Sequence, residues 1–210
     1  MALKIGTFSI KVFGNKYLAV LFVSCFPLIE LKGAIPIGMS EAFGMELWET
    51  ALIAYLGSTL MSVILFFLLI PVFNLLKKIK PIRRLVEKIE GTLSDKAQKI
   101  AAKTNGSAEA EARKILMWSL FLFVAVPFPV TGVWTGTAIA VFLGMKFKET
   151  FLPIALGNLV AGGIITLLTF LFGAYVDYII YTLFAIAIIM LVVFIVKVIK
   201  SKPKGEDEDA

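Results

Sequence analysis

Two charged residues, Glu30 and Lys32, lie two positions apart within an apolar part of the sequence. A charge at bilayer depth costs roughly 2.5–3.5 kcal/mol on insertion scales, so such residues usually pair or serve a function. Burial favours the protonated form of a carboxyl group, which makes Glu30 a candidate proton or cation site, although a positive Lys32 opposes that effect. Lys32, with free amides at the start of a helix, is a candidate anion contact. A purely structural ion pair is the alternative interpretation.

A second candidate segment lies about one hundred residues later and carries no charge. It offers hydroxyl groups, irregular backbone around two prolines, and the large ring of Trp134, which can face a lipid or an organic cation. A packing role for this ring is the alternative. Asn158 is a further polar residue in an apolar run, and we expect an interhelical hydrogen bond from it. The candidate substrate- or ion-binding residues are Glu30, Lys32, Gly33, Pro36, Pro129, Thr131, Gly132, Trp134, Thr135 and Asn158.

The residue types that are missing narrow the chemistry. The sequence contains no histidine and one cysteine, Cys25, which lies in an apolar stretch. Zinc sites and histidine-based triads need ligands and bases that this chain does not supply. Glu30 and Asp177 are not expected to meet, and no nucleophile has a base beside it. We therefore expect no enzymatic activity, no cofactor and no metal site.

The composition predicts an all-α integral membrane protein. The chain has 210 residues, of which 59% are hydrophobic, and its mean hydropathy is +0.91. Soluble domains are about 45–50% apolar. A spanning helix needs roughly 20 apolar residues. The charge-free runs that reach or exceed about that length are 50–76, 115–145, 150–176 and 178–196.

The sequence is repeated at an offset of one hundred residues. Of the fifteen positions from 44 to 58, seven are identical to those one hundred later, where composition alone predicts about one or two. The stretch 17–29 is short for a span, and 115–145 is broken at its centre by Pro and Gly. We interpret both as re-entrant hairpins, each followed by a transmembrane helix. Gly57, Gly157, Ala161 and Gly162 are expected to let helices approach closely.

An odd number of crossings per copy requires the second copy to be inverted, as in many carriers. The hinge around Glu46 carries acids, whereas the hinge around Lys146 carries lysines, in agreement with inversion. A single transmembrane helix over 17–43 is the alternative, and it would place the lysines near the N-terminus on the cytoplasmic side. The expected order is N-terminal segment 1–16, hairpin 17–44, transmembrane helix 49–76, linker 77–114, hairpin 115–145, transmembrane helix 149–173, final transmembrane helix 175–197 and disordered acidic tail 198–210.

The linker 77–114 carries eleven Lys or Arg against five acids. This excess places it on the cytoplasmic side, and the tail follows it there. It is either an interfacial helix on anionic headgroups or a solvated connector. Nucleic-acid binding is not expected of a short loop between spans. The protein is therefore expected in the inner or plasma membrane as a multi-pass protein, with membrane lipids as partners and a homo-oligomer compatible with this layout.

Two segments resemble the signatures of the small multidrug export protein family. They are 30–38 (ELKGAIPIG) and 127–136 (PFPVTGVWTG), and the Gly157-Asn158 pair is also similar. Lys32 stands where arginine is common, and Val130 where glycine is common. The family is similar to the wider DedA-like superfamily, which implies two re-entrant hairpins from opposite faces and the movement of lipids, notably polyprenyl-phosphate carriers, or of ions and drugs coupled to protons.

These observations together predict a small transporter or exporter, proton- or ion-coupled, that moves a small amphipathic or drug-like substrate. Protons or cations are the expected coupling partners. A lipid flippase or scramblase for polyprenyl-phosphate or phospholipid is the first alternative. A membrane scaffold or insertion factor that holds a partner with the basic linker is the second.

Overall fold

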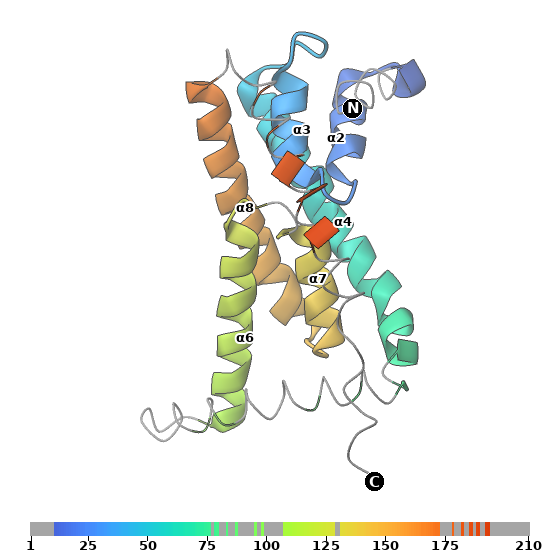
Figure 1. The fold of residues 1–210 in the computed structure, drawn as a ribbon, viewed down its shortest axis with the longest axis vertical. Coiled ribbons are helices and arrows are strands. Elements are labelled where there is room, and N and C mark those ends of the chain that lie inside the picture. Colours follow the sequence, from blue (N-terminus) through green and yellow to red (C-terminus); the bar gives the residue numbers. More distant parts are fainter. Residues whose placement is uncertain are drawn as a thin grey trace.

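The computed structural model is built from α-helices (Figure 1). It describes residues 11–76, 107–128 and 131–172, with single positions between 78 and 98 and between 178 and 193, and contains no strand within these residues. The helices are α2 (Lys16–Ser24), α3 (Glu30–Met39), α4 (Leu47–Leu76), α6 (Ala108–Ala125), α7 (Val133–Phe142) and α8 (Phe147–Leu171).

Two of these helices, α4 and α8, are long and apolar enough to cross a membrane. Their most apolar windows have mean hydropathies of 2.4 and 2.1. At 1.5 Å per residue, 30 and 25 residues reach about 45 and 37 Å, against a hydrocarbon core of about 30 Å. In Figure 1, α4 runs downward and α8 runs upward. Large apolar side chains such as Trp48 (78% exposed) and Phe170 (68%) cover the outside, as lipid-facing surfaces require.

The four shorter helices form two hairpins, α2–α3 and α6–α7. The side chain of Asn15 caps α2 by accepting from Tyr17 N at 2.8 Å, and Ser107 caps α6 by accepting from Ala110 N at 3.2 Å. The ten residues of α3 and of α7 reach only about 15 Å each. Figure 1 places α2–α3 in the upper half and α6–α7 in the lower half.

The turn that follows each hairpin uses a glycine in the left-handed region. Gly44 and Gly144 have φ angles of 53° and 70°, which residues with a side chain rarely adopt. Each glycine is followed by the start of a long helix, α4 or α8. The repeated Gly-Met pair therefore marks the same backbone turn twice.

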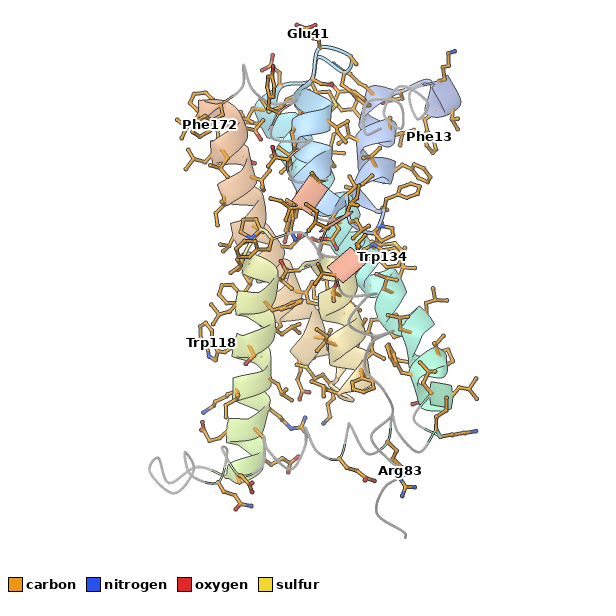
Figure 2. All side chains as sticks on the ribbon, viewed as in Figure 1. Phe13, Glu41, Arg83, Trp118, Trp134 and Phe172 are labelled. Carbon is orange, nitrogen blue, oxygen red and sulfur yellow. The ribbon has the colours of Figure 1, made fainter. Side chains whose placement is uncertain are left out.

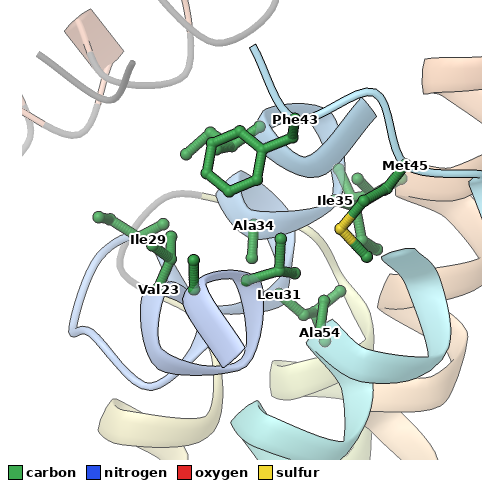
Figure 3. Close-up of a cluster of buried hydrophobic side chains, with 12 residues drawn as sticks. Val23, Ile29, Leu31, Ala34, Ile35, Phe43, Met45 and Ala54 are labelled. Atoms are coloured by element: carbon green, nitrogen blue, oxygen red, sulfur yellow. The ribbon is translucent and has the colours of Figure 1, made fainter. Parts of the chain in front are cut away.

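Each hairpin packs its own apolar cluster. The first joins Val23, Leu31 and Ile35 to Ala54 of α4 (Figure 3). The second joins Val124 and Val133 to Ile154 of α8. Val124 stands one hundred residues after Ser24, and Ile154 one hundred after Ala54, so the two copies bury equivalent positions.

The expected close approach at two repeated glycines is confirmed. A Cβ atom on Gly57 would lie 2.6 Å from the carbonyl oxygen of Leu21, and one on Gly157 would lie 2.7 Å from that of Phe121. Both partners are also one hundred residues apart. The contact between the first hairpin arm and its long helix is thus built in the same way in both copies.

Several expected segments lie outside the described residues. These are residues 1–10, most of the linker 77–114, the final transmembrane helix 175–197 apart from single positions, and the tail 198–210. The helix α6 begins at Ala108, so the first arm of the second hairpin starts within the segment assigned to the linker.

Candidate functional site

The tips of the two hairpins meet around Glu30 and Lys32. Both residues belong to the first turn of α3, and only 5% and 7% of their surfaces are exposed. The Lys32 ammonium nitrogen lies 3.6 Å from Oε2 of Glu30. Leu28 and Glu30 have positive φ angles of 70° and 47°. Such backbone costs on the order of 1–3 kcal/mol per residue and persists only where surrounding contacts hold it.

The carboxylate of Glu30 sits at the N-terminus of α7. Its Oε1 accepts a hydrogen bond from Trp134 N at 3.0 Å, and the Val133 N–H also faces it. The residue before α7 is Gly132, which has no side chain to cap the helix. A Cβ atom there would lie 1.8 Å from Oε2 of Glu30. Glu30 therefore caps α7 from the other hairpin, and Gly132 leaves the space for it.

Lys32 binds the opposite tip through main-chain oxygens. Its ammonium group donates to the carbonyl oxygens of Phe128, at 3.0 Å, and of Thr131. The Thr131 hydroxyl oxygen lies 2.8 and 2.9 Å from the carbonyl oxygens of Val126 and Phe128, and shares its one proton between them. The hydroxyl therefore stabilises the loop of the tip, while the carbonyl of the same residue holds the lysine.

Trp134 ties the second tip back to the first. Its indole Nε1 donates to the carbonyl oxygen of Cys25, at the C-terminal end of α2, at a distance of 2.9 Å. Figure 2 shows this tryptophan near the centre of the molecule, between Glu41 at the top and Arg83 at the bottom. Main-chain N–H and C=O groups that lack a helical partner at the turn of each hairpin thus form hydrogen bonds with side chains of the residues at the other tip.

A small cavity of about 60 Å³ lies between the tips. Ligand pockets usually measure about 300–1,000 Å³, so the described arrangement is closed around the ion pair. Its walls combine the two charged groups with apolar and aromatic side chains. The lining residues are Pro27, Leu28, Glu30, Lys32, Phe128, Thr131, Trp134 and Thr135.

The structure brings six of the ten predicted residues together at the tips, since Gly132 contacts Glu30 and five others line the cavity. Gly33 and Pro36 are buried within α3 and do not line it. Asn158 is 1% exposed, and its amide nitrogen donates to Oγ1 of Thr59 at 3.0 Å, which confirms the expected interhelical hydrogen bond. Pro129 lies outside the described residues.

Sequence reasoning missed four contributors to the site. Cys25 and Phe128 take part through their carbonyl oxygens, and Pro27 and Leu28 line the cavity. A main-chain carbonyl leaves no mark on residue type, so only the fold could identify the first two. Pro27 and Pro127 also stand one hundred residues apart, and this match between the two copies was the available signal for the first tip.

Comparison with known proteins identifies one related family. A family model described as "Putative small multi-drug export protein" matches residues 30–165, a range that runs from Glu30 in the first tip into α8 and includes the whole second tip. No curated protein and no solved structure matches the chain.

Proposed function

The chain belongs to the small multi-drug export protein family, and on this premise we propose that it is a proton-coupled membrane transporter whose substrate site lies between the hairpin tips. The family name supports a general role in transport. The observation that carries the finer proposal is the buried Glu30–Lys32 pair, which joins the two hairpins. Charged groups at such depth are expensive and generally mark the path of a substrate or ion.

The proposed membrane arrangement is an inverted repeat. α4 and α8 cross the bilayer in opposite directions, and each hairpin enters from one face and returns to it. Irregular backbone is tolerated at membrane depth only where it is buried in protein or lines a cavity. The exchange of hydrogen bonds between the tips meets that condition and supports this layout. The basic linker and the C-terminus then face the cytoplasm.

The site must open for a substrate to pass. Separating the tips would take the Trp134 N–H away from the Glu30 carboxylate, and the carbonyl groups of Phe128 and Thr131 away from the Lys32 ammonium. A hydrogen bond to a charged group contributes about 1.5–3 kcal/mol, so these contacts hold the tips closed. A proton on Glu30 removes the negative charge that holds α7 and Lys32 together. Protonation is therefore the step that we propose for releasing the tips, with alternating exposure of the cavity as the result.

Reconstitution of the full chain in vesicles tests this proposal. Uptake of small amphipathic probes, both cationic and anionic, is followed with and without a pH difference across the membrane. Glu30→Gln should abolish the dependence on pH, and Lys32→Gln should abolish uptake. The exposed residues Glu41 and Lys148 provide matched controls, and their change to Gln should leave uptake as in the unmodified protein. Pair variants that transport as well as these controls would rule out the site.

A lipid flippase or scramblase is the second candidate. An apolar groove of about 550 Å³ lies between α4 and α8, lined by residues that include Leu52, Gly163 and Phe170, and this apolar lining suits an acyl chain. The same vesicles, prepared with a labelled phospholipid, distinguish the two. Protein-dependent loss of leaflet asymmetry without probe uptake would favour lipid movement.

A further inference from the structure

The closed site is electrically balanced by its own residues. Among the described residues, Lys32 is the one charged side chain that lies against Glu30. Cys25, which follows α2, and Tyr55 of α4 donate hydrogen bonds to main-chain carbonyl groups. One carboxylate and one ammonium group therefore cancel, and the site holds no net charge.

Adding a proton to Glu30 breaks this balance. The neutral carboxyl group is a weaker acceptor for Trp134 N than the carboxylate, and the Lys32 ammonium remains buried without a counter-charge. An unpaired buried charge is far costlier than a paired one. The space around the Glu30 oxygens is bounded by Lys32 and by the positive end of α7, and both favour an anion there.

We propose that the substrate is a small amphipathic carboxylate that binds together with the proton on Glu30. This inference rests on the transport function proposed above and adds the substrate class. A planar anion with two oxygens has the shape of the ionised Glu30 side chain, so it can take over the contacts to Trp134 N and Lys32 when the neutral Glu30 side chain turns aside. Phe128 and Leu28 supply apolar walls for the rest of the molecule.

The charge count excludes a cationic substrate at this site. A cation entering beside Glu30 would add a second positive charge next to Lys32 and leave the site with a net charge of one. A proton plus a monoanion adds none, since Glu30 becomes neutral while the anion replaces its charge. Each cycle therefore carries one proton and one carboxylate in the same direction, without net charge movement across the membrane.

Trp134 provides a direct reporter of this binding. The sequence has three tryptophans, and Trp48 and Trp118 are exposed on the outer surface. The full chain carrying Trp48→Phe and Trp118→Phe is placed in lipid nanodiscs. Its tryptophan fluorescence then comes from Trp134 and reports ligand binding at the site. The three probes share one ring: cyclohexanecarboxylate, cyclohexylammonium and cyclohexyl phosphate. Titrations run from about pH 6 to 8, where the carboxylate probe stays ionised.

The expected result is binding of the carboxylate that weakens about tenfold per pH unit as the pH rises, because one proton is taken up with each anion. Glu30→Gln should bind it equally at all pH values, since Gln is always neutral. Lys32→Gln should lose binding at least tenfold, and Lys32→Arg should retain it. The slope in the unmodified site is informative even if a variant fails to fold.

Three outcomes would overturn the inference: binding of the ammonium probe alone, preference for the doubly charged phosphate, or carboxylate binding that does not change with pH. The first two leave the proposed transport function intact, provided that vesicles take up the favoured probe and Glu30→Gln abolishes its pH dependence. If the vesicles take up none of the probes, and Glu30→Gln behaves like the unmodified protein, the proposed transport function itself is wrong.

Discussion

Gly132→Ala is the most direct test of the contact between the tips. The added Cβ atom would lie 1.8 Å from Oε2 of Glu30, and real Cβ contacts are essentially never shorter than 3.0 Å. The carboxylate must therefore retreat by about 1.2 Å from a position where it accepts from Trp134 N at 3.0 Å. Losing a hydrogen bond to a charged group costs about 1.5–3 kcal/mol. At 2–4 °C per kcal/mol, the midpoint of thermal unfolding should fall by about 3–12 °C.

The measurement is thermal unfolding of the purified protein in one detergent, with two comparisons. Gly163→Ala is the matched control, because a Cβ atom on Gly163 meets nothing within 4 Å, and its midpoint should not fall. The second comparison repeats Gly132→Ala in a Glu30→Ala background. The three atoms nearest to the new Cβ all belong to Glu30, so the substitution should then cost less, and what remains is the strain of an alanine at a φ angle of 159°. Equal costs in both backgrounds would refute the reasoning.

Three further predictions follow from contacts described above. Trp134→Phe keeps an aromatic ring but removes the 2.9 Å hydrogen bond from the indole, so the unfolding free energy should drop by about 0.5–1.5 kcal/mol. Loss of transport under conditions where this variant stays folded would show a functional role. A double-mutant cycle of Asn158→Ala and Thr59→Val should give a coupling of about 0.6–1.7 kcal/mol, whereas additive effects would contradict the interhelical hydrogen bond. The hydrogen bond from Arg113 lowers the pKa of Glu109 below its usual value of about 4.3. The pair therefore stabilises the fold above that pH, and this stabilisation is lost as the pH falls through the lowered pKa. In Arg113→Gln, a carboxyl titration by NMR should show the pKa of Glu109 return toward about 4.3.

Composition and the length of the charge-free runs predicted the helical class, and the repeat with its Pro and Gly residues predicted the places where the chain breaks. The expectation at Gly57 and Gly157 was specific because both copies place a glycine where two helices must touch. Glu30 and Lys32 stood out because charge is rare in an apolar segment. Their proximity to each other followed from spacing alone.

The partners of the ion pair could not be predicted in the same way. Lys32 contacts the carbonyl groups of Phe128 and Thr131, and every residue type supplies a carbonyl. The role of Gly132 is likewise defined by an atom of Glu30 that lies far away in sequence. Asn158 was assigned to the site because it is polar, yet its amide contacts Thr59. Residue type indicated which groups needed partners, while the fold determined which partners they received.

The exchange of contacts between the tips has a consequence for synthesis of the chain. Glu30 receives its hydrogen bond from a residue 104 positions later. At about 5–20 residues per second, the ribosome needs about 5–20 s to add that stretch. During this interval the Glu30 carboxylate lacks the N–H of Trp134, and the carbonyl of Cys25 lacks the indole N–H of the same residue. We expect the first hairpin to remain at the bilayer surface or against the insertion machinery during synthesis. It should reach its final position only after the second hairpin has been made.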